Sequence, residues 1–146
     1  MEIVEIPKER LVDIEHLWND LNQYHNDKSS HFNDYSEKHD FLNSRKTLLA
    51  RDKLAIFVAV DEDKMIGYCI SSIEGGLGEI DSMYVKKEYR NNGTGTKLAS
   101  HAMVWLQKNS PIEINIYVAE GNESIIPFYE RSGFLKKYYV LQQKNS

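Results

Sequence analysis

The stretch Gly78–Leu106, GEIDSMYVKKEYRNNGTGTKLASHAMVWL, decides how the rest of the chain is interpreted. Its first part alternates as a β-strand. One predicted face carries Ile80, Ser82 and Tyr84, and the other carries Glu79, Asp81, Met83 and Val85. A polar turn follows at 86–92. Gly93-Thr94-Gly95-Thr96 then opens a helix whose apolar positions form one stripe, Leu98, Ala99, Ala102, Met103 and Leu106. The stretch therefore predicts a strand, a glycine loop and a helix N-terminus in that order.

A junction of this kind can bind an anion. The first amides of a helix have no intrahelical partner, and the macrodipole places partial positive charge there. Gly93 and Gly95 remove side chains that would keep a phosphate from the backbone, and Arg90 adds a cation at the start of the loop. The alternative is an ordinary strand-to-helix turn that uses glycine for its geometry alone.

Two common nucleotide-binding signatures are absent from the loop. Thr96 rather than glycine precedes Lys97, so there is no GxxxxGK[ST] run, and Leu98 replaces the third glycine of GxGxxG. What remains is an R-x-x-G-x-G pattern over 90–95, with Val85 five residues before the arginine. This run resembles the pyrophosphate loop of the GNAT superfamily, the acyl-CoA-dependent N-acetyltransferases.

A second resemblance lies at 118–134, VAEGNESIIPFYERSGF. It is similar to the later GNAT motif, in which a strand ends, an Asn starts a helix and the helix closes with Y-E-x-x-G-F. Together the two motifs cover about the last half of the chain and imply acetyl-CoA as the co-substrate. The resemblance implies these cofactor-binding residues: Met83, Tyr84, Val85, Arg90, Asn91, Asn92, Gly93, Thr94, Gly95, Thr96 and Asn122. Asn122 could equally be a helix N-cap, and the two roles are compatible.

Acetyl transfer also needs a proton donor and a route for the proton of the amine. The resemblance implies that Tyr129 is the general acid, since a phenol of ordinary pKa is protonated at neutral pH, although it could merely pack one face of a short helix. Glu79 and Asp81 are the candidate bases because they lie two apart on one strand. The alternative is a proton path through water without a single essential base.

Length and composition are those of one soluble domain, 1–146, with 41% hydrophobic and 27% charged residues. A net charge of −4 gives no reason to expect nucleic acid, and no apolar run is long enough for a membrane helix. The single cysteine, Cys69, is expected to pack as a small hydrophobe in a reducing, cytoplasmic compartment. The five histidines show no metal-ligand spacing, so no metal is expected.

The other elements follow from periodicity and turn residues. We expect strands at 2–6, 54–60, 65–73, 112–118 and 134–141, helices at 9–25, 36–51 and 122–131, and a long loop at 24–35. Consecutive hairpins make the sheet antiparallel through 54–85, and the helical crossover favours a parallel neighbour at 112–118. This agrees with the α/β GNAT fold, a mixed and mostly antiparallel sheet flanked by helices, whose splayed parallel pair is implied by the resemblance alone.

The expected function is transfer of an acetyl group from acetyl-CoA to a primary amine of a small molecule or peptide, by direct attack in a ternary complex. The alternative is a non-catalytic acyl-CoA-binding module of the same fold. His25 and His31 either line the acceptor site or belong to a solvated loop. A homodimer is expected through the apolar last strand, which carries Tyr138, Tyr139 and Leu141.

Overall fold

The computed structural model describes residues 1–28, 41–118 and 123–144. Within these ranges five strands form one sheet in the order β1-β2-β3-β4-β5. Their bounds are β1 Glu2–Ile6, β2 Lys53–Asp61, β3 Lys64–Glu74, β4 Leu77–Val85 and β5 Glu113–Ile116. The pairs from β1 to β4 are antiparallel, whereas β5 runs parallel to β4. The predicted mixed sheet is therefore confirmed.

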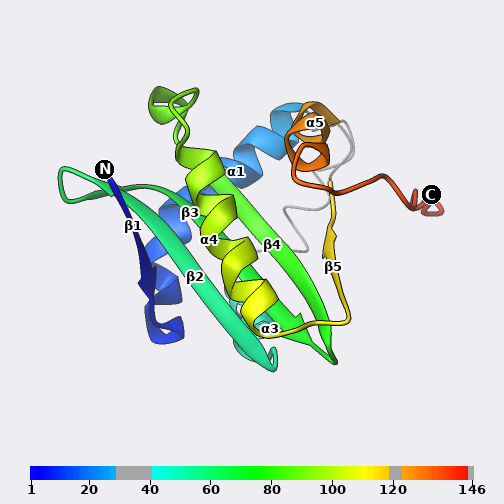
Figure 1. The fold of residues 1–146 in the computed structure, drawn as a ribbon. Coiled ribbons are helices and arrows are strands. Elements are labelled where there is room, and N and C mark those ends of the chain that lie inside the picture. Colours follow the sequence, from blue (N-terminus) through cyan, green and yellow to red (C-terminus); the bar gives the residue numbers. More distant parts are fainter. Residues whose placement is uncertain (29–40, 119–122, 145–146) are drawn as a thin grey trace.

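Helices cover both faces of the sheet (Figure 1). The helical elements are η1 Lys8–Ile14, α1 Glu15–Lys28, α3 Phe41–Leu49, η2 Lys87–Tyr89, α4 Thr94–Lys108, η3 Glu123–Ile125 and α5 Ile126–Glu130. On one face α4 packs its predicted stripe against β2, β3 and β4, in a core that includes Phe57, Cys69, Leu98 and Leu106. On the other face η1, α1 and α3 enclose a second core that includes Leu17, Ile56, Tyr68 and Ile70.

The strand β2 is buried on both faces, as its unbroken apolar run predicts. Every residue from Ala55 to Ala59 is buried, because α4 covers one side of the strand and η1 with α1 the other. The turn to β3 places Glu62 and Asp63 in the left-handed region, with φ of 49° and 65°. Two successive residues of positive φ match the right-handed twist of a hairpin. The hairpin predicted at this position is confirmed.

A β-bulge at Asp81 interrupts the alternation of β4. The pairing of β3 with β4 skips this residue, in the register Ile70↔Ser82, Ser71↔Ile80. Because one extra residue reverses the alternation, Ile80 packs in the α4-side core while Tyr84 packs in the α1-side core. The prediction that Ile80 and Tyr84 share a face was therefore wrong, since it assumed an uninterrupted ladder.

The first helices differ from their predicted bounds. The segment predicted as one helix over 9–25 begins as the 3-10 turn η1 and continues as α1 to Lys28, so His25 lies in a helix rather than in a loop. In α3 the apolar residues differ in burial. Phe41 is buried and contacts Trp18 of α1 edge to face, with 5.5 Å between the ring centres, whereas Leu42 is 52% exposed. His31 and the predicted helix over 36–40 lie outside the described residues.

The strands β4 and β5 diverge along their length. Their parallel ladder covers Leu77–Ile80 of β4 and ends at the pair Ile80↔Ile116, although β4 continues to Val85. Figure 1 shows the two strands separating toward the end at which α5 lies. The splay implied by the resemblance is thus present, and it leaves the last residues of β4 without β5 as a neighbour.

The end of the chain corrects two predictions. Residues 134–141 form no strand: within the described part of the chain they pair with no sheet edge, and Leu135 to Leu141 follow α5 as irregular backbone. High β-propensity does not create a strand without a neighbouring ladder. The strand predicted at 112–118 is shorter in the structure, where β5 covers only Glu113–Ile116. Ile112, at the start of the predicted strand, is 82% exposed.

Candidate active site

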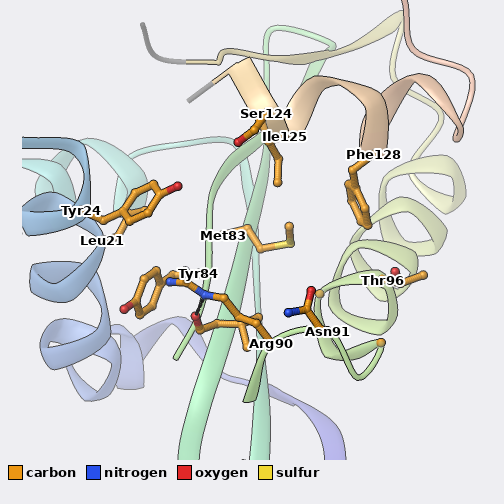
Figure 2. A pocket seen from close by; sticks show the side chains of 13 residues that line it. Leu21, Tyr24, Met83, Tyr84, Arg90, Asn91, Thr96, Ser124, Ile125 and Phe128 are labelled. Atoms are coloured by element: carbon orange, nitrogen blue, oxygen red, sulfur yellow. Dashed lines mark hydrogen bonds between the residues drawn. The ribbon is translucent and has the colours of Figure 1, made fainter. Parts of the chain in front are cut away.

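A pocket of about 350 Å³ opens where β4 separates from β5. Three parts of the chain enclose it: α1, the end of β4 with the glycine loop, and the segment of η3 and α5 (Figure 2). Its walls are Leu21 and Tyr24; Met83, Tyr84 and Val85; Arg90, Asn91, Gly93, Gly95 and Thr96; and Ser124, Ile125 and Phe128. The divergence of the strands therefore exposes the end of β4 to a cavity rather than to another strand.

The glycine loop directs the start of α4 at this pocket. Gly93 is the N-cap, with φ of 87°, a left-handed conformation that favours glycine. Its carbonyl accepts the first helical bond from the amide of Lys97 at 3.0 Å. Gly95 and Thr96, in the first turn of α4, line the pocket, so the positive end of the helix dipole lies at the cavity.

Asn92 and Thr94 build the loop instead of lining the cavity. The side-chain oxygen of Asn92 accepts hydrogen bonds from the Thr94 amide at 3.2 Å and from the Thr94 hydroxyl at 2.6 Å. Thr94 is 1% exposed, so these bonds satisfy a buried hydroxyl and one of the unpaired amides of the helix start. The remaining predicted cofactor-binding residues of β4 and the loop line the pocket, and Asn122 lies outside the described residues.

Arg90 is held in place by three groups. Its Nε donates to the carbonyl of Val85 at 2.8 Å, and its guanidinium lies 5.2 Å from the ring centre of Tyr84 and 5.5 Å from that of Tyr24. Figure 2 shows the arginine beside Tyr84 at the edge of the pocket. Cation–π contacts on both rings orient the side chain, so the charge at the loop is positioned before any ligand arrives.

An added side chain at Gly95 would have room. A Cβ at this position meets no atom within 4 Å, and the backbone there has no left-handed φ. The fold itself therefore does not require glycine at 95. Since Gly95 lines the pocket, a larger residue would instead occupy the space in front of the helix N-terminus, which is where an anionic ligand would lie.

Tyr129 does not line the pocket but packs in the α4-side core. The residue is 8% exposed, and its ring meets those of Phe128 at 5.0 Å and Phe134 at 5.8 Å, both edge to face. Burial, with a smaller contribution from Cys69, raises the pKa of the Tyr129 phenol above its ordinary value. The packing predicted as the simpler role of Tyr129 is therefore present, and the hydroxyl stays protonated at neutral pH.

Asp81 and Glu79 form a carboxylate pair beneath the bulge. Asp81 accepts a hydrogen bond from the Ser72 hydroxyl at 2.6 Å, and its other oxygen lies 4.0 Å from the guanidinium of Arg51. Burial and the neighbouring Glu79 raise the pKa of Asp81 to about 8, although Ser72 and Arg51 act in the opposite direction. Neither carboxylate lines the pocket; Met83, which follows Asp81 by two residues, does.

The sequence did not identify the wall that α1 contributes. Leu21 lies in the helix predicted over 9–25 and Tyr24 in the loop predicted over 24–35, so neither was singled out as a site residue. An apolar and an aromatic residue at helical spacing are the usual signature of a core contact. Ser124, Ile125 and Phe128 belong to the second motif, but only the tertiary structure shows that they face the glycine loop.

Neither a cluster of metal-binding side chains nor a membrane-spanning helix is present in the part of the chain that the structure describes. In 1–28, 41–118 and 123–144, no three side chains of the metal-binding types converge on one point. Within the same ranges, no helix combines the length and the apolar character required to cross a bilayer.

The fold and the pocket define an α/β protein with a split sheet and a helix that begins at the pocket. Residues 14–134 match the model of the acetyltransferase (GNAT) family, and the chain belongs to this family.

Relatives of known name are N-acetyltransferases. The chain is 34% identical over 94 residues to N-alpha-acetyltransferase 30 of Schizosaccharomyces pombe, a match that covers 58% of this chain and 63% of the relative. It is 31% identical over 105 residues to an N-alpha-acetyltransferase of Saccharolobus solfataricus, and this match covers 60% of this chain and 63% of the relative. An uncharacterized N-acetyltransferase of Methanocaldococcus jannaschii is 31% identical over 102 residues, a match that covers 65% of this chain and 45% of the relative. These matches span less than two thirds of each relative.

Solved structures share the fold at lower identity. A putative acetyl transferase from Pyrococcus furiosus superimposes with a TM-score of 0.75 at 19% identity, covering 99% of this chain and all of that one. Aminoglycoside N-acetyltransferase AAC(6')-Iy in complex with CoA gives a TM-score of 0.66 at 18% identity, with 99% of each chain covered. At this identity the likeness establishes the arrangement of the elements.

Proposed function

We propose that this protein is an acetyl-CoA-dependent N-acetyltransferase that acetylates a primary amine by direct attack in a ternary complex. The observation that carries the proposal is the pocket in which three features meet: the start of α4, the oriented Arg90 and the part of β4 that extends beyond its pairing with β5. Membership of the acetyltransferase family and the named N-acetyltransferase relatives support it. The test is the release of free CoA when the purified protein is given acetyl-CoA and a panel of amines.

The residues of the glycine loop suit a pyrophosphate. The amides at the start of α4, Gly95 without a side chain and the cation of Arg90 would hold it, mostly through the backbone. Met83 and Val85 would offer backbone groups to the acyl end, because β5 has left β4 at that point, whereas the backbone of Tyr84 faces β3. Acetyl-CoA supplies the acetyl group as a thioester, and the chain supplies orientation and proton transfer.

Tyr129 is proposed to assist the leaving group. It packs in the same core as Met83, which lines the pocket, so its position links the later motif to the end of β4. Its raised pKa lies above the value of about 8.5 for an ordinary thiol. The hydroxyl would therefore stabilise a departing thiolate by donating a hydrogen bond, rather than by giving up its proton completely.

Asp81 and Glu79 are proposed as the pair that takes the proton of the amine. With a pKa of about 8, Asp81 is a stronger base than an ordinary carboxylate, and it is ionised only above that pH. Because the pair is coupled, a pH profile reports on both carboxylates together. A proton path through water remains the alternative, in which the pair orders the water.

The pH dependence separates these two routes. With an acceptor amine whose own pKa lies below about 7, the change in rate near pH 8 would belong to the enzyme. Asp81→Asn should abolish that change, and Glu79→Gln should move it, if the pair is the base. An unchanged profile in both variants would favour water alone.

The acceptor is proposed to be an amine at the N-terminus of a peptide or protein. Two relatives are named N-alpha-acetyltransferases, whereas the aminoglycoside enzymes share only the fold. Parallel assays with short peptides, aminoglycosides and polyamines distinguish these classes. Turnover of aminoglycosides without turnover of peptides would reverse the assignment and leave acetyl transfer itself intact.

A non-catalytic acyl-CoA-binding module is the competing function. It predicts tight acetyl-CoA binding without CoA release for any amine in the panel. We further propose a cytoplasmic homodimer: the only cysteine, Cys69, is fully buried and unpaired, which suits a reducing compartment, and the apolar end of the chain needs cover. Light scattering at micromolar concentration tests the dimer.

A further inference from the structure

Arg51 lies in the connection between α3 and β2 and directs its charge at the carboxylate of Asp81. Its Nη2 atom is 4.0 Å from Oδ1 of Asp81, and the arginine side chain is 29% exposed. Its Nε is buried and, among the described residues, donates to no acceptor. A buried donor without an acceptor is unfavourable. The interaction that accounts for this arginine is therefore its charge beside Asp81.

Two hydrogen bonds fix the connection that carries Arg51. The carboxylate of Asp52 accepts from the amide of Gly75 at 2.9 Å, and the carboxylate of Glu74 accepts from the amide of Asp52 at 2.8 Å. Both partners lie at the turn between β3 and β4. The connection is thus held to the same hairpin that carries Asp81, so the backbone of Arg51 has a fixed place relative to that carboxylate.

The bulge of β4 places Asp81 where this charge is effective. The ladder between β3 and β4 skips Asp81, and its carboxylate accepts from the Ser72 hydroxyl at 2.6 Å. The side chain of Asp81 is 7% exposed. Because water screens a buried charge only weakly, the nearest cation has a large effect on its ionisation.

The described groups that face Asp81 come from three parts of the chain. Burial and Glu79 on the same strand raise the pKa of Asp81, whereas Ser72 of β3 and Arg51 of the α3–β2 connection lower it. Cys69 of β3 also faces it, but burial raises the pKa of this thiol to about 12, so the thiol stays uncharged. Among these groups Arg51 is the cation that favours the ionised form of Asp81.

We propose that Arg51 is a positioning residue of the acetyl-transfer reaction, which acts through Asp81 and keeps the Asp81–Glu79 pair able to take the proton of the amine. This role rests on the proposed function of the pair as the base. Two neighbouring carboxylates disfavour each other's charge, so without the cation the pair would ionise only at higher pH. Arg51 does not line the pocket, so it touches neither acetyl-CoA nor the acceptor there.

The reaction moves one proton at the pair. The nitrogen of the neutral amine attacks the thioester carbonyl and forms the C–N bond, and the C–S bond breaks with its electron pair leaving on the CoA sulfur. One N–H proton passes to the pair, directly or through a water, and later returns to solvent, while the thiolate takes up a proton. Arg51 exchanges no proton, and it changes only the fraction of the pair that is ionised.

Variants of Arg51 separate its charge from its packing. Arg51→Gln removes the charge and keeps a polar side chain, and Arg51→Met removes the charge and keeps an apolar stem. Arg51→Lys keeps a cation and should resemble the unchanged protein. The matched control is Lys53→Gln, which removes an exposed cation of the neighbouring strand start whose Nζ donates to Asn109 at 3.0 Å. Circular dichroism establishes which variants are folded.

Carbon-13 NMR of the Asp81 carboxyl follows its titration without any substrate, and the loss of the resonance in Asp81→Asn assigns it. In Arg51→Gln and Arg51→Met the midpoint should move upward by roughly one pH unit or more, the usual effect of losing an opposite charge at this range. Arg51→Lys should keep most of the original midpoint, and Lys53→Gln should leave it unchanged.

Single-turnover acetyl transfer gives the second measurement, with an acceptor amine whose own pKa lies below about 7. The chemical step of the two neutral variants should be about tenfold slower at pH 7, because a midpoint one unit higher leaves about a tenth of the ionised form. The rate should approach that of the unchanged protein at high pH, and Arg51→Lys should restore most of it at pH 7. A merely structural role would lower the rate by one factor at every pH.

Three outcomes would overturn the role of Arg51. The first is an Asp81 midpoint that stays fixed in a folded neutral variant, or that moves equally in Lys53→Gln. The second is a rate that is unchanged, or lowered by the same factor at every pH. The third is a failure of both neutral variants to fold while Arg51→Lys folds, which would assign the arginine to the stability of the fold.

The proposed function fails by a different result. An unchanged protein that releases no CoA with any amine of the panel would reject acetyl transfer itself. A fixed midpoint in a protein that does release CoA would reject the role of Arg51 alone.

Discussion

Tyr129 combines a structural and a proposed chemical role in one side chain. Its ring packs between Phe128 and Phe134, and its carbonyl accepts from the amides of Ser132 and Phe134, which closes the turn after α5. A phenylalanine keeps the ring contacts and the backbone bonds. The substitution therefore separates the hydroxyl from the packing.

The first prediction is that Tyr129→Phe leaves acetyl-CoA affinity near its original value and lowers turnover by roughly 10²–10³-fold, the usual worth of one donor to a developing anion. Calorimetry measures the affinity, and single-turnover kinetics measure the chemical step. Full turnover in a variant whose chemical step is rate-limiting would leave Tyr129 with the packing role alone.

Asp81 gives a prediction about stability. The pKa of Asp81 is about 8 in the folded protein, against an ordinary value of 3.8, so the folded state binds this proton more tightly. That contribution is present in full below pH 3.8 and is lost progressively up to about pH 8, as a charge forms in a buried site. Asparagine stays neutral at every pH and avoids this loss.

We expect Asp81→Asn to gain stability relative to the unchanged protein as the pH rises from 5 to 9. The difference in unfolding free energy, variant minus unchanged protein, should increase by on the order of a few kcal/mol. Urea unfolding at each pH measures the difference. Asp63→Asn, at an exposed carboxylate of the β2–β3 turn, controls for the loss of one negative charge. A difference that is the same at both pH values would mean that Asp81 does not titrate between them, which would contradict a pKa of about 8.

At the scale of the element, the glycine loop and α4 carry the cofactor hypothesis. Gly95→Val should leave the circular dichroism spectrum unchanged, because a Cβ there meets no atom within 4 Å. The branched side chain would occupy the pocket before the helix N-terminus, so acetyl-CoA should bind at least about tenfold more weakly, a loss of 1.4 kcal/mol or more. Calorimetry measures the change.

The control for Gly95→Val is Ser100→Val, which adds a valine to an exposed position of the same helix, away from the pocket. Valine has a higher helix propensity than glycine and about the same propensity as serine, so neither variant weakens the helix in this way. A loss of affinity shared by both variants would therefore be an effect on α4 as a whole. A folded Gly95→Val protein with undiminished affinity would exclude this loop as the phosphate site.

The elements that the sequence predicted well are those that local rules determine. The helix start at Gly93, the apolar stripe of α4 and the hairpin between β2 and β3 are signals contained within a few residues. The bulge at Asp81 and the missing strand at 134–141 are different, because strand register and strand existence depend on a neighbour that lies far away in the chain.

The same distinction applies to the site. Residues of β4 and the loop were predicted because one continuous motif contains them, and most of them line the pocket. Asn92 and Thr94 bond to each other instead, which needs the loop geometry to be known. The wall of α1 with Tyr24 is brought to Arg90 by the packing of the whole domain, and no local pattern could indicate it.

At the scale of the whole molecule, the pocket joins the N-terminal third of the chain to its last helix. Leu21 of α1 and Phe128 of α5 both line it, so a ligand that bridges them stabilises the folded state as a unit. Acetyl-CoA at 100 times its dissociation constant should raise the unfolding free energy by about 2.7 kcal/mol.

Thermal unfolding with acetyl-CoA, and with pantetheine as the control, measures this stabilisation. Pantetheine lacks the pyrophosphate and should produce a much smaller shift at the same concentration. Equal shifts with the two compounds would indicate that the glycine loop and the start of α4 contribute little to binding.

The strand order of the sheet repeats the strand order of the chain. During synthesis on the ribosome, each emerging strand would meet an edge that the preceding strand has already formed. A nascent chain that has just exposed Val85 would hold β1 to β4 with the α1-side core, while Phe57 and Cys69 still lack their cover on the other face. That face stays bare until α4 emerges, and this interval is when chaperone binding to the nascent protein would protect it most.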